Sequence, residues 1–185
     1  MLFLGDSITA ARDYVVDLQT ALGLHGHTPE IIALGLPSEG VTGLSEPPHP
    51  FPRPDVTERL TRALGKSKPD LVIACYGMND GIYHPFSESR FIQYQKGIHS
   101  LIDKVNASGA QLILLTPPPF DPQAPRIKNK LVGKNSPVFS WTKIYENYDS
   151  EVIARYATFI LSLKSRVAQV ADIHTPIKKH MVEKR

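Results

Sequence analysis

The sequence is poor in cysteine, in long apolar segments and in any excess of one charge. Its single cysteine, Cys75, excludes an internal disulfide and a metal site built from cysteines. No apolar stretch approaches the roughly 20 residues that a membrane-spanning helix needs. The net charge is only +3, and the one basic run, residues 178–185, is typical of a solvated helix face. We therefore expect a globular protein with no nucleic-acid partner and no membrane span.

The length of 185 residues fits one domain, which we expect to span residues 1–185. The first four residues, Met-Leu-Phe-Leu, lead straight into a turn, so no signal peptide is recognisable. As the chain stands this predicts a cytoplasmic protein. Removal of an N-terminal leader would instead make it secreted or periplasmic.

Short apolar runs alternate along the chain with segments of helical periodicity. This alternation is typical of a parallel sheet covered by helices on both faces. We predict an α/β fold, a three-layer α/β/α sandwich with a central, mostly parallel sheet. The expected strands are residues 2–4, 31–34, 71–76, 111–116 and 168–173. The expected helices are residues 13–24, 55–64, 87–109 and 150–167, with a short one from Pro176.

Two long segments fall outside this pattern. Residues 35–54 are rich in proline, glycine and serine, and loops of this length within a compact domain are usually functional. Residues 121–147 are polar and irregular, and we interpret them as an insertion that borders the site. In sheets of this kind ligands bind beyond the carboxyl ends of the strands. The loops that follow the strands, residues 35–54 among them, are therefore expected to surround one crevice.

Gly5-Asp6-Ser7 stands where the first strand passes into a helix. A serine at this junction directs its hydroxyl into the crevice, and the backbone N–H groups that follow face the same way. This suits a nucleophile, because N–H groups stabilise the negative charge that attack creates on a carbonyl oxygen. From these residues alone, Ser7 could equally be a helix N-cap. We expect Asp6, and likewise Asp80, to hydrogen-bond nearby backbone rather than act as a catalytic carboxylate.

Gly77-Met78-Asn79-Asp80 follows the central strand, where the Asn79 carboxamide can point toward Ser7. On its own this segment could be an ordinary turn. Together, the two segments resemble the Gly-Asp-Ser and Gly-x-Asn-Asp blocks of the SGNH/GDSL hydrolases, a family of esterases and acylhydrolases with a flavodoxin-like fold. The resemblance implies a serine esterase that cleaves small carboxylic esters through an acyl-enzyme on Ser7. It implies no metal and no organic cofactor.

The family's second conserved block, which follows the second strand, departs from its pattern here. That block resembles Asn-x-Gly-x-x-Gly, and this chain has Ala33, Gly35 and Ser38 at the three positions. The backbone N–H of the last position serves the family as an oxyanion donor, and Ser38 retains an N–H. The resemblance therefore implies an oxyanion hole made of the Ser7 N–H, the Ser38 N–H and the Asn79 side chain.

The general base has no direct counterpart in the sequence. The family closes with a block that resembles Asp-x-x-His-Pro, and the nearest match is Asp172-Ile173-His174, with the pair one residue closer. In one interpretation His174 is the base and Asp172 its helper. In the other, both residues merely end the last strand, and the family's block would lie in a segment beyond Arg185, so that the chain is truncated or its catalysis impaired. Members of the family usually continue past this strand through a loop and a helix, which favours the second interpretation. His84 is a further candidate for the site.

The substrate follows less directly from the residues. Residues 35–54 offer polar side chains and no wide apolar cap, and the insertion carries three aromatic residues that could pack on sugar faces: Trp141, Tyr145 and Tyr148. These favour an acetylated carbohydrate over a long-chain lipid. A catalytically silent member of the fold that binds a ligand in the crevice is the main alternative. A flavodoxin-like nucleotide binder is a weaker one, because neither Gly-x-Gly-x-x-Gly nor a Gly-Lys-Ser/Thr turn is present.

Overall fold

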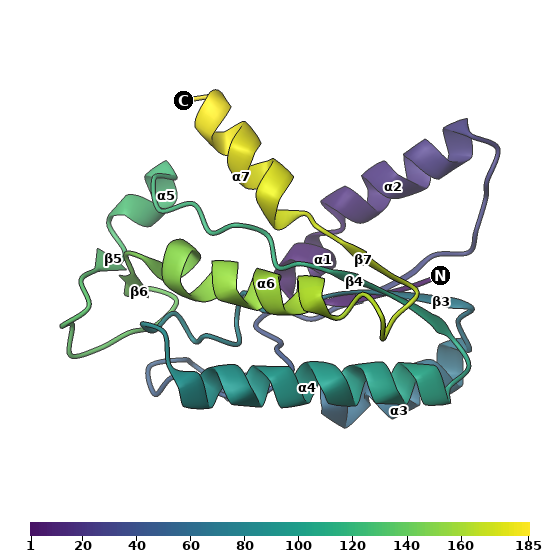
Figure 1. The fold of residues 1–185 in the computed structure, drawn as a ribbon, viewed down its shortest axis with the longest axis horizontal. Coiled ribbons are helices and arrows are strands. Elements are labelled where there is room, and N and C mark those ends of the chain that lie inside the picture. The colour runs from purple at the N-terminus through teal and green to yellow at the C-terminus, as the bar shows by residue number, and fades with distance from the viewer.

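The computed structural model describes residues 1–185 as a three-layer α/β/α sandwich, which confirms the predicted fold class. Two long helices, α3 and α4, lie below the central sheet in Figure 1, and α2 and α7 rise above it. The helices are α1 (Ser7–Ala11), α2 (Asp13–Leu24), α3 (Val56–Ser67), α4 (Glu88–Ala107), α5 (Pro125–Lys128), α6 (Ala154–Ser162) and α7 (His174–Glu183). No helix is long and apolar enough to cross a membrane.

The central sheet has five parallel strands in the order β2-β1-β3-β4-β7. Its strands are β1 (Leu2–Gly5), β2 (Ile32–Gly35), β3 (Leu71–Cys75), β4 (Gln111–Leu115) and β7 (Gln169–Ala171). All five were expected from the sequence, and β7 is shorter than predicted. The order reverses between β1 and β3, so the topological switch point lies between these two strands.

Side-chain caps begin two of the predicted helices. Asp55 accepts a hydrogen bond from the Thr57 backbone N–H at 2.8 Å and begins α3, and the Ser87 hydroxyl accepts one from the Arg90 N–H at 3.5 Å and begins α4. Such caps satisfy backbone donors that the first helical turn leaves unpaired. The starts of α3 and α4 thus lie within one residue of the prediction, and α2 begins at Asp13 as predicted without a side-chain cap.

Most of the apolar core lies on the α3 and α4 side of the sheet. There 26 buried residues form one cluster, whereas the α2 side holds a buried cluster of only three, Phe3, Val15 and Ile73. Within the larger cluster the rings of Tyr94 on α4 and Tyr156 on α6 stack with centroids 4.2 Å apart. The central sheet is therefore packed mainly against the helices on one of its two faces.

Two regions differ from the prediction. Residues 121–147 contain the short helix α5 and two paired strands, β5 (Leu131–Val132) and β6 (Ile144–Tyr145). The helix expected over residues 150–167 begins instead as a π-helix, Tyr148–Ile153, and α6 ends at Ser162. Hydropathy patterns assume 3.6 residues per turn, and a wider π turn breaks that periodicity.

Gly35 shows why the second strand must end in glycine. A Cβ atom at this position would lie 2.1 Å from the backbone nitrogen of Ala10 in α1. The absence of a side chain lets α1 pack directly against the end of β2, and thus brings the turn that carries Ser7 beside the loop that follows β2.

Candidate active site

The two sequence blocks meet at the switch point of the sheet. Ser7 follows β1 and Asn79 follows β3, and these strands are paired in register with Gly5 opposite Cys75. On the other side of β1, Gly5 lies opposite Gly35, and the Leu36 N–H donates to the Gly5 carbonyl at 2.9 Å. The loops after β1, β2 and β3 therefore surround one place, as the sequence predicted.

Ser7 is the first residue of α1, and its side chain is exposed. Asp6 is the N-cap of this helix, since its Oδ1 accepts a hydrogen bond from the Ile8 N–H at 2.9 Å. The alternative that Ser7 itself is the cap does not hold, and its hydroxyl is free to face a ligand. The structural role expected for Asp6 is confirmed.

Asp6 also connects the two blocks directly. Its Oδ2 accepts a hydrogen bond from Asn79 Nδ2 at 3.2 Å, across 73 residues of sequence. The carboxyl is almost wholly buried, and burial raises its pKa to about 6, with the nearby Glu39 charge acting in the same direction. A buried carboxylate thus holds the asparagine side chain against the turn that carries Ser7.

The Asn79 carboxamide is fully hydrogen-bonded. Its Nδ2 also donates to the Glu39 carbonyl at 3.1 Å, and its Oδ1 accepts from Arg53 Nη1 at 2.9 Å and from the Tyr83 hydroxyl at 3.1 Å. Acceptors surround the nitrogen and donors surround the oxygen, which fixes the orientation of the amide. The N–H expected to point at a substrate is engaged with the protein here, so a bound oxyanion would have to share it.

Ser38 has a backbone conformation that ordinarily favours glycine, the residue at this position of the family pattern. Its φ is +68°, in the left-handed region that a residue with a side chain occupies at some cost. The Ser38 carbonyl accepts a hydrogen bond from Arg53 Nη1 at 3.4 Å, and its hydroxyl lies 3.2 Å from His49 Nε2. The serine therefore keeps the glycine-like geometry and adds a hydroxyl to it.

Sequence reasoning missed Arg53, which is central to the site. Its side chain is 2 % exposed and is paired with Glu46 through two bonds of 2.7 Å. Although burial opposes the charge, the Glu46 carboxylate raises the pKa of Arg53. Glu46 also accepts a hydrogen bond from the Trp141 N–H at 3.2 Å, which connects the insertion to the site. The sequence gave no sign that Arg53 would be buried, because an arginine in a loop is ordinarily exposed.

The pairing of Asp172 with His174 is not found. His174 is buried, and its Nε2 lies 3.2 Å from Asp149, not Asp172. Asp172 instead accepts from the Thr175 N–H at 3.1 Å and from the Thr116 hydroxyl at 3.3 Å. Spacing alone could not reveal Asp149, which lies 25 residues earlier in the chain.

His174 and Ser7 also follow strands that are not neighbours in the sheet. His174 follows β7, an edge strand three positions from β1. At the usual spacing of neighbouring strands, the ends of β1 and β7 lie about 14 Å apart. None of the hydrogen bonds made by histidine rings reaches Ser7, including that of His84, whose Nδ1 contacts the Ile82 carbonyl.

Comparison with known proteins agrees with this geometry. Residues 3–182 match the GDSL-like Lipase/Acylhydrolase family. The chain belongs to that family. It is thus a member of a family of carboxylic ester hydrolases. This membership argues against the alternative that the chain is a nucleotide-binding protein. No curated protein matches the chain.

Solved structures share the fold at low sequence identity. A mutant of Axe2, an acetyl-xylooligosaccharide esterase from Geobacillus stearothermophilus, is 19% identical with a TM-score of 0.62, over 98% of this chain and 78% of that one. The aryl esterase of M. smegmatis is 20% identical with a TM-score of 0.61, over 92% and 82%. The esterase EstA from Pseudoalteromonas is 18% identical with a TM-score of 0.58, over 92% and 75%.

Two of the aromatic residues expected to contact a sugar are inaccessible in this GDSL chain. Tyr145 and Tyr148 are 1% and 0% exposed, and the Tyr148 hydroxyl donates to the Met78 carbonyl at 2.8 Å. Trp141 is 44% exposed, and the Lys130 ammonium lies over its ring at 5.3 Å from the centroid. Of the three, only Trp141 can offer a ring face to a ligand.

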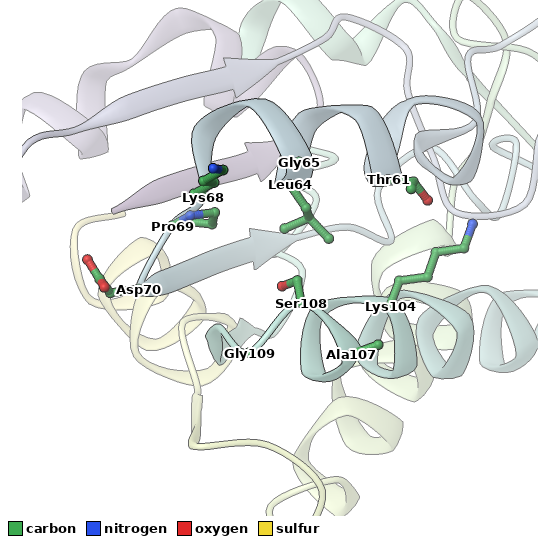
Figure 2. Close-up of a pocket in the computed structure, with 10 residues that line it drawn as sticks. All are labelled: Thr61, Leu64, Gly65, Lys68, Pro69, Asp70, Lys104, Ala107, Ser108 and Gly109. Atoms are coloured by element: carbon green, nitrogen blue, oxygen red, sulfur yellow. The ribbon is translucent and has the colours of Figure 1, made fainter.

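One hollow of the surface is distant from these residues. Figure 2 shows this cavity of about 710 Å³ between the last turns of α3 and α4. It includes Asp70 and Gly109, which lie just before β3 and β4 and so at the amino-terminal ends of these strands, whereas Ser7 follows the carboxyl end of β1. It holds none of the family's conserved blocks.

Proposed function

We propose that this protein is a serine esterase that cleaves small carboxylic esters through an acyl-enzyme on Ser7. The observation that carries the proposal is the hydrogen bond between Asp6 and Asn79, which joins the Gly-Asp-Ser turn to the Gly-x-Asn-Asp turn beside an exposed serine hydroxyl. In this scheme Ser7 attacks the ester carbonyl and the alcohol leaves, after which water releases the acid.

The oxyanion of each tetrahedral intermediate is assigned to three donors. These are the backbone N–H groups of Ser7 and Ser38 and the Asn79 carboxamide. The left-handed backbone at Ser38 supports its inclusion, because that is the conformation in which glycine is favoured at this position of the family pattern. Removing one such donor typically lowers the rate by about 10²–10³.

The acyl group is proposed to be acetyl, and the alcohol a carbohydrate. Support comes from the polar, ion-paired loop around Glu46 and Arg53 and from the exposed ring of Trp141, which that loop holds through a backbone hydrogen bond. Sugars commonly pack on such rings. Axe2, which shares the fold, is an acetyl-xylooligosaccharide esterase.

The first experiment is hydrolysis of p-nitrophenyl acetate by the wild-type chain, Ser7→Ala and Ser100→Ala. Ser100 lies within α4 and serves as the matched control. We expect hydrolysis by the wild type and by Ser100→Ala, and none above the buffer rate by Ser7→Ala. A wild-type chain that is silent on esters but binds acetylated xylose would favour the alternative, a binding protein of the same fold.

A further inference from the structure

Two adjacent residues with a left-handed backbone follow the Gly-Met-Asn-Asp block. Ile82 has a φ of +45° and Tyr83 a φ of +59°. Residues with side chains occupy this region at some cost, and for a β-branched residue such as isoleucine it is an outlier. No other two adjacent residues of the chain share this conformation. Strain of this kind persists only where the surrounding structure fixes it, and it is concentrated at functional sites.

Main-chain hydrogen bonds hold this turn in place. The Ile82 N–H donates to the Asn79 carbonyl at 3.0 Å, and the Tyr83 carbonyl accepts from the Tyr145 N–H at 3.0 Å. The turn reverses the chain directly after Asn79 and returns the Tyr83 side chain to a residue four positions earlier. There the Tyr83 hydroxyl lies 3.1 Å from Asn79 Oδ1. The strained backbone thus brings a hydroxyl to the carboxamide that we assign to the oxyanion.

The Tyr83 hydroxyl is the donor in this bond. An amide oxygen can only accept, so the phenol must supply the proton. Burial raises the pKa of Tyr83 to about 12, although the nearby Arg53 charge opposes the shift. The ring packs on that of Tyr148 with centroids 5.2 Å apart, and the Arg53 guanidinium lies over it at 5.4 Å from the centroid. The hydroxyl therefore keeps its proton, and the ring is held on more than one side chain.

Both donors to Asn79 Oδ1 are held by the insertion, residues 121–147. The carboxylate that pairs with Arg53 accepts a hydrogen bond from the Trp141 N–H at 3.2 Å. The carbonyl of Tyr83 accepts one from the Tyr145 N–H, four residues further along. The insertion thus reaches Asn79 by two separate routes, one through a guanidinium and one through a phenol.

Two donors on its oxygen have two effects on the Asn79 carboxamide. They fix the orientation of the amide, because a rotation by 180° would turn its nitrogen toward both donors. They also polarise the amide, and hydrogen-bonded groups that polarise one another make stronger donors. Both effects favour a carboxamide that stabilises negative charge on a carbonyl oxygen.

We propose that Tyr83 is a positioning residue of the esterase reaction, whose hydroxyl fixes and polarises the Asn79 carboxamide. The inference rests on the proposed esterase function. Tyr83 transfers no proton and need not touch the substrate. Its effect is greatest when the carbonyl oxygen of the ester gains negative charge, so it stabilises the transition state more than the bound substrate.

The test uses Tyr83→Phe, which removes the hydroxyl and keeps the ring. Tyr94→Phe is the matched control, because the Tyr94 hydroxyl donates to the Tyr76 carbonyl at 3.0 Å. Each variant loses one hydrogen bond from a tyrosine hydroxyl, and only the first of these bonds involves Asn79. Asn79→Ala, alone and combined with Tyr83→Phe, completes a double-mutant cycle. Thermal unfolding establishes that every variant is folded.

In p-nitrophenyl acetate hydrolysis we expect kcat of Tyr83→Phe to fall about three- to tenfold, the effect of one neutral hydrogen bond, with little change in KM. Tyr94→Phe should keep the wild-type kcat. Asn79→Ala should lose about 10²–10³ in kcat. Adding Tyr83→Phe to Asn79→Ala should cause no further loss, because the hydroxyl then has no carboxamide to position.

A second measurement does not depend on turnover. Phenylboronic acid forms a tetrahedral adduct with a serine hydroxyl and so imitates the intermediate. Its inhibition constant should rise in Tyr83→Phe by about the factor by which kcat falls, and should stay at the wild-type value in Tyr94→Phe.

The opposing outcomes are distinct from one another. An unchanged kcat in a folded Tyr83→Phe would overturn the inference and leave the esterase function intact. An equal loss of rate with and without the Asn79 side chain would also overturn it, because the hydroxyl would then act independently of the carboxamide. So would an equal loss in Tyr94→Phe. A wild-type chain that neither hydrolyses the ester nor is labelled at Ser7 by a fluorophosphonate would overturn the proposed function, and this inference with it.

Discussion

The guanidinium of Arg53 lies 2.9 Å from the Oδ1 of Asn79, so a buried cation holds the carboxamide that we propose as an oxyanion donor. The same cation forms two bonds to Glu46, and neither partner is more than 2% exposed in its side chain. Buried ion pairs of this kind contribute less to stability than to a fixed geometry, because desolvation offsets much of their attraction. The orientation of Asn79 therefore depends on a residue that need not contact substrate.

The first prediction concerns the dependence of the Asn79 orientation on Arg53. Arg53→Lys keeps the charge but loses the planar fork that reaches Glu46 and Asn79 together. We expect kcat to fall by roughly tenfold, less than the loss of an oxyanion donor itself, with KM nearly unchanged. Steady-state kinetics on p-nitrophenyl acetate would measure this, and a wild-type kcat in a folded Arg53→Lys would contradict it. Arg53→Ala should also lose about 3–5 kcal/mol of stability, because Glu46 is left buried and unpaired.

The second prediction concerns the sugar-binding face of Trp141. If its exposed ring packs on the carbohydrate, Trp141→Ala should raise KM for acetylated xylose while the rate with p-nitrophenyl acetate stays close to wild type. Trp141→Phe, which keeps a ring, should recover much of the loss. Equal losses on both substrates would indicate that Trp141 supports Glu46 through its backbone rather than contacting sugar. Faster turnover of a long-chain ester than of acetylated xylose would reverse the proposed specificity.

The sequence was sufficient to predict the sheet, the capped helices and the meeting of Ser7 with Asn79. The periodicity of apolar residues indicates which positions are buried, and so predicts the strands and helices. The carboxyl ends of parallel strands all lie on the same side of the sheet, and so the loops that carry Ser7 and Asn79 must lie close together. Arg53 could not be found in this way. Its role depends on burial within an irregular loop, and no periodicity describes such a loop.

The histidines illustrate the same limit. His174 attracted attention because Asp172 is two residues away, yet the partner of its ring is Asp149. Proximity along the chain indicated the wrong carboxylate, and only the packing of the π-helix that carries Asp149 reveals the right one.

The third prediction separates a structural from a catalytic role for His174. Burial acts against the charge of Asp149, but bonds from His174, Lys178 and the Phe120 N–H outweigh it and lower its pKa. A depressed carboxyl pKa adds stability that is present above the unfolded value and is lost as the pH falls through the folded value. His174→Ala should therefore cost about 1–3 kcal/mol near neutral pH and shift acid unfolding to higher pH.

Urea unfolding at several pH values would measure the effect of His174→Ala. Turnover per folded molecule should be preserved in this variant. A folded His174→Ala with unchanged stability and no ester hydrolysis would instead restore His174 as the base, the first interpretation of the sequence.

The last prediction concerns Asp80, whose carboxyl is buried beside the segment that follows β2. Its Oδ1 accepts from the Val41 N–H at 2.7 Å, which confirms the structural role expected for it, and its Oδ2 has no partner. Burial raises its pKa to about 7, although the bond from Val41 opposes the shift. The folded state thus holds a proton that the unfolded state releases, and the free energy of unfolding should fall as the pH rises from about 4 to about 7.

Asp80→Asn removes this ionisation and retains a carbonyl oxygen for the Val41 N–H. We expect the variant to lose much of the decline in stability between these pH values, whatever its absolute stability, since its new amide N–H groups gain no acceptor. Asp6, with a pKa raised to about 6, should leave a smaller residual slope. Asp17→Asn, at an exposed position of α2, is the control and should follow the wild type. Identical pH slopes for wild type and Asp80→Asn in urea unfolding would mean that Asp80 is already ionised in the folded protein at low pH.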